Sequence, residues 1–391
     1  MKVAISDSVK YIGVDDKTID LFESQYVVPN GVSYNSYLIL DEKVALMDTV
    51  DARCMDEWET KLVSELAGRN VDYLVISHLE PDHSGSISRI VELYPNVTLV
   101  GNAKTFAMLP QFMDLPLEGH TITVKEGDSL ELGAHTLNLY MAPMVHWPEV
   151  MVTYESSEKI LFSADGFGKF GALDIEDEEG WACEARRYYF NIVGKYGAPV
   201  QMLLKKAATL DIKTICPLHG PILNENLEYY INLYDIWSSY KPEDKGVLIA
   251  YASIHGNTGK AAHRLAELIR EKGEKKVVVS DLAREDMAEV IEDAFRYDRM
   301  ILAAASYDAG VFPCMQDFLH HLQSKAYQNR TVGILENGSW APTAGKTMKS
   351  IVETLKNVDV VEPMVTIKST LKAENMKDME ALAQAIVDAG K

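Results

Sequence analysis

The sequence of 391 residues is poor in cysteine, and the four that it has are widely separated. Cys54, Cys183, Cys216 and Cys314 form no Cys-x-x-Cys pair. This excludes a thiolate-bound iron–sulfur centre, and it gives no sign of a disulfide framework. A reducing compartment, and hence a cytoplasmic location, is the expected setting.

The sequence also lacks long apolar runs and an excess of basic residues. No stretch approaches the roughly 18 apolar residues that a membrane span needs, and residues 1–16 have neither the apolar core nor the cleavage site of a signal peptide. Lys and Arg total 38 against 58 Asp and Glu, a formal net charge of −20, which would repel a nucleic-acid backbone. We therefore expect neither a membrane nor a nucleic acid as partner. No Gly-x-Gly-x-x-Gly motif opens a helix after a strand, so NAD(P)H is not an expected cofactor.

A chain of this length is too long for one ordinary core, so two domains are expected. The best boundary is the polar stretch at residues 240–246, which has proline near its start and glycine at its end. This divides the chain into residues 1–243 and 246–391.

The two parts differ in their pattern of strands. The first begins with short strands, has the turn signal Asn30-Gly31, and continues with helical patterns between buried strands; the expected strands are at 3–6, 25–28, 36–40, 43–47, 73–76 and 159–162. This order indicates packed sheets flanked by helices. The second part has apolar runs that are each followed by a helical pattern, at 247–251, 276–279, 300–303 and 331–335. That alternation predicts a doubly wound parallel sheet, which binds ligands beyond the carboxyl ends of its strands.

The most informative segment is residues 77–85, which follow a buried strand. Four possible metal ligands fall within six residues there: His78, Glu80, Asp82 and His83. Packing these groups together without a cation would cost on the order of several kcal/mol in repulsion and desolvation. Single candidates follow at later strand ends, where such a residue is by itself more often a turn residue: His146, Asp165 and His219.

The pattern His-x-Glu-x-Asp-His, with these three later residues, resembles the flavodiiron branch of the metallo-β-lactamase fold, and so do residues 31–39 and 185–189. Hydrolytic relatives usually carry His where this chain has Glu80, and three carboxylates beside four imidazoles suit iron. The resemblance implies that one iron binds His78, Glu80 and His146. It implies that the other binds Asp82, His83 and His219, with Asp165 as the bridge. Tyr189 is expected to donate a supporting hydrogen bond near this site.

The second part contains a phosphate-binding pattern after its first expected strand. Residues 253–259 are rich in small and hydroxyl residues and precede a helix expected to begin near Lys260. Exposed backbone N–H groups at such a helix terminus bind phosphate. The segment resembles the flavodoxin phosphate loop, which implies an FMN site; the residues expected to contact the cofactor here are Ser253, His255, Gly256, Asn257 and Thr258.

By the same resemblance, the loops after the next two strands hold the flavin ring. Tyr307 and Trp340 are the stacking candidates, and the other expected contacts are Ser306, Asp308, Ala309, Gly310, Asn337, Gly338 and Ser339. Both loops depart from the usual pattern: the first has no Ser/Thr-Pro-Thr sequence, and the second lacks the Gly-aromatic-Gly-Trp spacing.

Together the two resemblances imply an N-terminal metallo-β-lactamase-like αββα sandwich and a C-terminal flavodoxin-like domain. They imply an enzyme with FMN and two iron ions per chain that reduces dioxygen to water, nitric oxide to nitrous oxide, or both. The implied electron donor is a small protein such as rubredoxin, and the implied assembly is a head-to-tail homodimer or a dimer of dimers. Two alternatives remain: a binuclear zinc hydrolase with a regulatory flavin domain, and an electron carrier with a relic metal site. The complete set of seven ligands speaks against the relic.

Overall fold

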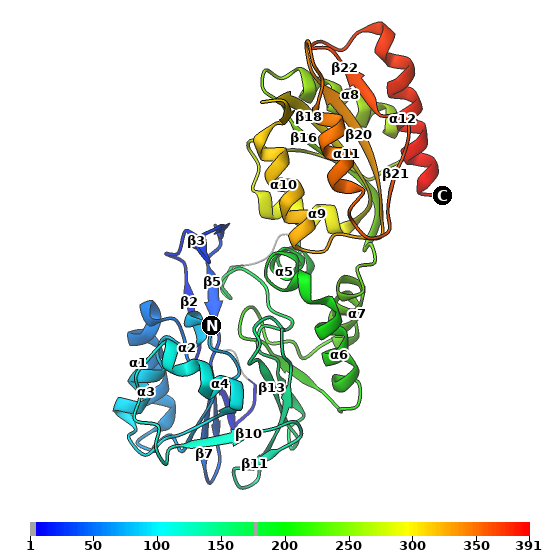
Figure 1. Ribbon diagram of the computed structural model, residues 1–391. Helices are drawn as coiled ribbons and strands as arrows, with labels where there is room; N and C mark the ends of the chain where they lie inside the picture. The colour runs from blue at the N-terminus through cyan, green and yellow to red at the C-terminus, as the bar shows by residue number, and fades with distance from the viewer. Residues whose placement is uncertain (1–4, 176–178) are drawn as a thin grey trace. The chain divides into compact units, whose positions relative to one another are not determined.

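The computed structural model describes residues 5–175 and 179–391, and its chain forms two compact units (Figure 1). Unit 1 consists of Met1–Tyr189 and Ala198–Asp235, and unit 2 of Phe190–Gly197 and Ile236–Lys391. The stretch at 240–246 therefore lies in unit 2 by packing. The functional boundary predicted there stays a prediction.

Unit 1 is built around two sheets that pack face to face. The first sheet has the order β1 (Val9–Tyr11), β6 (Tyr37–Leu40), β7 (Val44–Met47), β8 (Tyr73–Val75), β9 (Thr98–Asn102) and β10 (Thr121–Val124). The second has the order β11 (Ser129–Glu131), β12 (Thr136–Met141), β13 (Met151–Glu155), β14 (Ile160–Phe162) and β15 (Thr214–Cys216). Side chains from both sheets, such as Ile39, Val75, Leu139 and Phe162, form one buried core between them. The core follows from the two-residue period of the strands, which turns every second side chain inward.

Helices cover the outer sides of this sandwich (Figure 1). Beside the first sheet lie α1 (Met55–Leu66), α3 (Ile87–Leu93) and α4 (Ala103–Met108), and beside the second lie α5 (Trp181–Tyr188), α6 (Gly197–Ala207) and α7 (Leu227–Ser238). Two small ribbons complete the unit: β2 (Val14–Asp16) pairs with β5 (Val32–Tyr34), and β3 (Leu21–Phe22) pairs with β4 (Tyr26–Val27).

One histidine of unit 1 links stability to pH. His135 is buried between two carboxylates: its Nδ1 lies 2.7 Å from Asp41 and its Nε2 lies 3.0 Å from Glu158. Burial lowers the pKa of His135, but the hydrogen bonds to Glu158 and Asp41 outweigh burial, so the pKa is raised. A raised pKa in the folded state gives stability that is complete below the unfolded value of about 6.5 and is lost as pH rises through the folded value.

We therefore expect wild type to be more stable than His135→Gln at pH 5.5, and the gap to narrow as pH rises above neutrality. Midpoints of thermal unfolding for both proteins between pH 5.5 and 9 test this. A gap that is constant with pH, or that widens, would contradict it.

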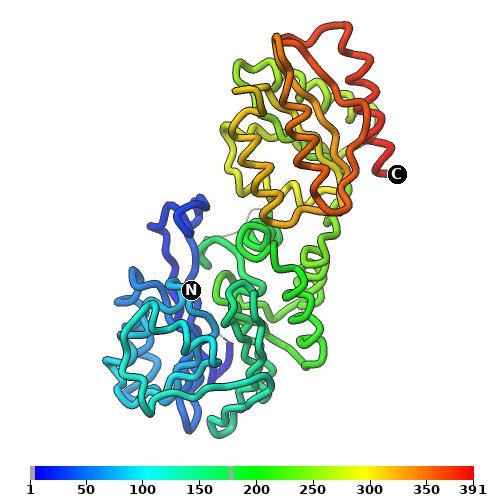
Figure 2. The backbone as a smooth tube through the Cα atoms, in the orientation of Figure 1, coloured from blue at the N-terminus to red at the C-terminus, as the bar shows by residue number. Residues whose placement is uncertain are grey.

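Unit 2 is a doubly wound sheet. Its strand order is β17 (Val277–Asp281), β16 (Asp244–Ala252), β18 (Tyr297–Tyr307), β20 (Arg330–Asn337) and β21 (Val358–Val360), with β22 (Val365–Ile367) also on β20; these strands pair in parallel. The short β19 (Gly310–Val311) turns back antiparallel on β18. Figure 2 follows the chain as it crosses back and forth over this sheet. The winding direction reverses between β16 and β18, where such sheets bind ligands.

Helices lie on both faces of that sheet. Apolar side chains of α8 (Asn257–Glu271) and α12 (Met376–Ala389) pack together on one side, in a core that includes Leu265, Ile269, Leu382 and Ile386. The other helices that pack on the sheet are α9 (Met287–Arg296), α10 (Pro313–Ser324) and α11 (Ala344–Val352).

Two local predictions need correction. The strand expected at residues 3–6 lies partly outside the described residues, and Ile5 and Ser6 are not in a strand; the edge strand of the first sheet is β1, where Val9 is buried. The helix expected near Lys260 begins earlier, at Asn257, because Gly256 takes a φ of 85° and lets the chain enter the helix directly. Among the described residues, no helix has both the length and the apolar character to cross a bilayer.

Candidate functional site

The seven predicted metal ligands all lie at strand ends or in the loops beside them in unit 1. His78 follows β8, Glu80 is the N-cap of the short helix α2 (Pro81–Ser84), and that helix carries Asp82 and His83. β14 and β15 run parallel. Their following residues Asp165 and His219 therefore leave the sheet at the same edge.

The side chains form two adjoining groups, as the sequence predicts. The first group is His78, Glu80, His146 and Asp165, whose ligand atoms all lie within 4.8 Å of one another. His146 Nε2 is 3.0 Å from both Glu80 Oε2 and Asp165 Oδ2, and His78 Nε2 is 3.2 Å from Glu80 Oε2.

The second group is Asp82, His83 and His219. Asp82 Oδ2 is 3.3 Å from His83 Nε2 and 3.2 Å from His219 Nε2. Asp165 joins the groups: its Oδ2 faces the first, and its Oδ1 lies 3.6 Å from His83 Nε2. One carboxylate with an oxygen toward each group is the arrangement that a bridging ligand requires.

The hydrogen bonding of these residues fits a pair of cations. All four oxygens of Asp82 and Asp165 are buried, and within the described residues no donor other than the imidazoles of the ligand histidines approaches them. Leaving buried carboxylate oxygens unmatched is costly unless a metal ion satisfies them. Carboxylate and imidazole ligands together suit iron.

The charges at the first group are set by close pairing. Burial works against a charged His146, but hydrogen bonds to Asp165 and Glu80 outweigh burial and raise its pKa to about 9. Burial also opposes charge on Asp165, yet His78 and His146 hold the pKa of that carboxyl below its usual range. At His83 burial dominates and lowers the pKa to about 4. Carboxylates held anionic against imidazole protons form a site that exchanges those protons for metal ions.

Aromatic rings surround the two groups. The ring of Trp147 lies 5.1 Å from that of His78 in an edge-to-face arrangement. Phe22, on β3, and Tyr188, at the end of α5, each lie 5.4 Å from the ring of His219. This apolar wall limits access of bulk water, which strengthens the electrostatic interactions inside it.

A second candidate site lies in unit 2, at the carboxyl ends of β16, β18 and β20. It is a cavity of about 560 Å³, which is in the size range of cofactor sites. All but two of the residues predicted to contact flavin line this cavity. The exceptions are Gly256, which caps α8, and Gly310, which lies in β19 and pairs with Tyr307 of β18. The side chain of Trp340 is 92% exposed at this site, and that of Tyr307 is 45% exposed.

The cavity has the features that a phosphate and a flavin ring require. The Ser253 hydroxyl is buried, and no described residue makes a hydrogen bond to it. α8 begins beside it and has no acidic residue in its first turn, so its N-terminus favours an anion.

Side chains tie the loops of this cavity together. Ser306 Oγ accepts hydrogen bonds from the N–H groups of Thr343, at 2.8 Å, and Ala344, at 3.1 Å. Asn337 donates to Thr258 Oγ1 at 3.2 Å and accepts from the Ser369 N–H at 2.8 Å. The loops after β16, β18, β20 and β22 therefore form one connected rim.

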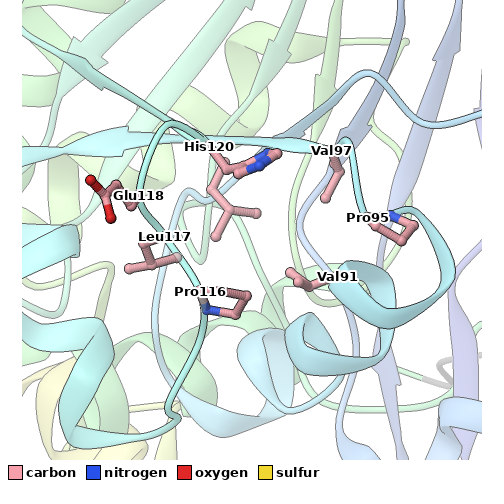
Figure 3. A pocket seen from close by; sticks show the side chains of 8 residues that line it. Val91, Pro95, Val97, Pro116, Leu117, Glu118 and His120 are labelled. Carbon is pink, nitrogen blue, oxygen red and sulfur yellow. The ribbon is translucent and has the colours of Figure 1, made fainter.

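Another cavity of unit 1 belongs to neither site. It has a volume of about 380 Å³ and is lined mainly by apolar side chains, among them Val91, Val97 and Leu117 (Figure 3). Glu118 and His120 are its polar members, and no predicted ligand lines it. We assign it no role.

Comparison with known proteins finds similar chains over the whole length of the sequence. A family model described as ODP family beta lactamase matches residues 32–220. The nitric oxide reductase of Moorella thermoacetica is 28% identical over 392 residues, with 98% of each chain covered. The rubredoxin oxygen:oxidoreductase of Desulfovibrio gigas superposes with a TM-score of 0.92 at 26% identity, over 100% of this chain and 98% of that one. The flavodiiron protein of Giardia intestinalis superposes with a TM-score of 0.89 at 24% identity, over 100% and 96%. Over its whole length, this chain is similar to flavodiiron proteins.

The chain is an oxidoreductase, with a metallo-β-lactamase-like fold in unit 1 and a flavodoxin-like fold in unit 2. This confirms the predicted family and fold class.

The two candidate sites contain residues that the sequence did not reveal. Glu149 lies beside His78, and Asp48 accepts a hydrogen bond from the Ser77 N–H at 2.7 Å. Neither has a local signal, because each acts across a long sequence separation. In unit 2, Thr343 and Ser369 also line the cavity; Ser369 follows the end of β22, a position where the sequence pattern could have indicated it.

Tyr189, predicted to support the metal site, is buried with its ring 5.2 Å from that of Tyr234. The ring of its neighbour Tyr188 lies 5.4 Å from that of the predicted ligand His219. The role predicted for Tyr189 stays a prediction, and Tyr188 is an additional candidate for it.

Proposed function

We propose that this flavodiiron oxidoreductase binds two iron ions at the seven ligands of unit 1 and FMN in the cavity of unit 2. Its proposed substrates are nitric oxide, reduced to nitrous oxide, and dioxygen, reduced to water. The observation that carries the proposal is the pair of adjoining buried ligand groups, which share Asp165. A relative named as a nitric oxide reductase and another named as an oxygen oxidoreductase support the two substrates.

The protein side chains have distinct parts in this reaction. When bound, the iron pair would supply gas-binding positions and electrons, and FMN would supply the electrons that replace them. His78, Glu80 and His146 would hold the first ion, Asp82, His83 and His219 the second, and Asp165 both. The aromatic wall of Phe22, Trp147 and Tyr188 would admit small uncharged gases and restrict water.

The gases differ in what they demand. Coupling two nitric oxide molecules to nitrous oxide and water consumes two electrons and two protons, and reducing dioxygen to two waters consumes four of each. The same ligands serve both reactions, so the preference between the gases needs measurement. A small rubredoxin-like protein is the proposed electron donor, in keeping with the name of the Desulfovibrio gigas relative.

The hydrolase alternative is not favoured. The relatives are named as oxidoreductases, and Glu80 gives the first group one carboxylate more than a zinc hydrolase needs.

Anaerobic reduction with dithionite, followed by each gas in turn, tests the proposal. We expect nitric oxide to reoxidise the flavin rapidly in the metal-loaded protein, as measured by the return of the flavin absorbance. Reoxidation should be much slower after a chelator has removed the metal. The flavin should remain bound in both samples, because its cavity lies in the other unit. Equal reoxidation by nitric oxide with and without metal would contradict the proposed role of the metal site.

A further inference from the structure

Glu149 lies against the metal groups without belonging to either. It lies three residues after His146, just before β13, and its side chain is fully buried. Its Oε1 is 3.0 Å from His78 Nδ1 and also accepts the Leu79 N–H at 2.9 Å. Its main-chain carbonyl accepts a hydrogen bond from Asn102 Nδ2 at 2.6 Å. One carboxylate oxygen is therefore held between the Leu79 N–H and the far nitrogen of a ligand imidazole, and the main chain of Glu149 is anchored separately.

The other ligand imidazoles have weaker support of this kind. His219 Nδ1 lies 2.7 Å from the Ser33 carbonyl oxygen, a neutral acceptor. His83 Nδ1 is buried and makes no hydrogen bond within the described part of the chain. Only the first group thus has a ligand imidazole backed by a carboxylate, as far as the described contacts show.

We propose that Glu149 is a positioning residue for the first metal position: the affinity of that position for its ion depends on Glu149, and the affinity of the second position does not. This inference rests on the proposed binding of two metal ions. By accepting the His78 Nδ1–H, the carboxylate keeps the lone pair on Nε2. That atom is 3.2 Å from Glu80 and 3.4 Å from Asp165. A hydrogen-bonded partner of this kind orients the ring and makes the imidazole a stronger ligand.

The test is titration of the full-length metal-free protein with Co²⁺, which reports coordination through its visible spectrum and needs no redox activity. Wild type should bind two ions per chain. Glu149→Ala should weaken one of the two positions by about 10–100-fold, the usual effect of losing such a partner, and leave the other unchanged. Glu149→Gln should bind nearly as wild type, because its amide oxygen can accept both hydrogen bonds.

Glu155→Ala is the matched control. Glu155 is equally buried in unit 1, but its oxygens accept from the N–H groups of Ser157 and Glu158 and from no metal ligand. Glu155→Ala should unfold at a lower temperature than wild type but still bind Co²⁺ at both positions. Should Glu149→Ala not fold, Glu149→Asp replaces it, because the shorter side chain withdraws the carboxylate from His78.

The outcomes separate the two proposals. Two tight Co²⁺ positions in Glu149→Ala, equal weakening of both, or a Gln variant as weak as the Ala variant would overturn the role of Glu149. The same holds if Glu155→Ala loses one position. A wild type that binds fewer than two ions would instead overturn the two-metal proposal, and the inference with it.

Discussion

Asp165→Ala is expected to abolish metal binding at both positions and to reduce gas turnover by more than about 100-fold. Loss of a residue that only hydrogen-bonds a ligand already lowers metal affinity or activity by about 10–100-fold, and Asp165 is itself a proposed ligand. Asp165 is the residue whose two oxygens face different groups. Its removal takes a ligand from each ion and the negative charge that offsets their mutual repulsion. Metal content by mass spectrometry and nitric oxide consumption measure the effect.

His146→Ala and His219→Ala serve as comparisons, since each removes one ligand from one group. Both should lose less metal than Asp165→Ala. The flavin spectrum should stay intact in all three variants, because the flavin cavity is in unit 2. Full metal content and full turnover in the three variants would show that the ligand assignment is wrong.

Mixed dimers of two inactive variants are expected to regain activity. Electron transfer requires the flavin and the metal pair to be close, and the proposed head-to-tail homodimer would let the flavin of one subunit serve the metal pair of its partner. Asp165→Ala supplies an intact flavin site. Thr258→Asp supplies an intact metal site. Its own flavin site should be disabled, because the new negative charge in the expected phosphate cradle repels phosphate.

Each variant alone should be inactive, and the re-associated mixture should recover a substantial share of wild-type nitric oxide turnover. Thr258→Ser, which keeps the hydroxyl, should remain active and shows that the position itself is tolerant. If purified heterodimers, identified by two different affinity tags, have no activity, transfer between subunits is excluded.

The proposed metal ligands could be singled out from the sequence because their signals are local. His78, Glu80, Asp82 and His83 stand within six residues, and His146, Asp165 and His219 each follow the end of a strand. The parallel pairing of β14 and β15 then brings distant residues to one edge. The family resemblance supplied the division into two groups, and the geometry agrees with it.

What could not be predicted depends on contacts across long separations. Glu149 reaches His78 over 71 residues, and nothing around Glu149 in the sequence distinguishes it from an ordinary loop residue. The edge strand was placed at residues 3–6 because that segment is apolar, whereas pairing with β6 selects Val9–Tyr11. Apolar character indicates a strand, but only the partner strand determines its register.

The hydrogen bonds of Asn337 to Thr258 and Ser369 have a consequence for how the cofactor is acquired. Because side chains already join the loops of the cavity, arrival of the flavin need not order them, and the entropy lost on binding is small. The affinity for the cofactor then reflects the new contacts almost undiminished.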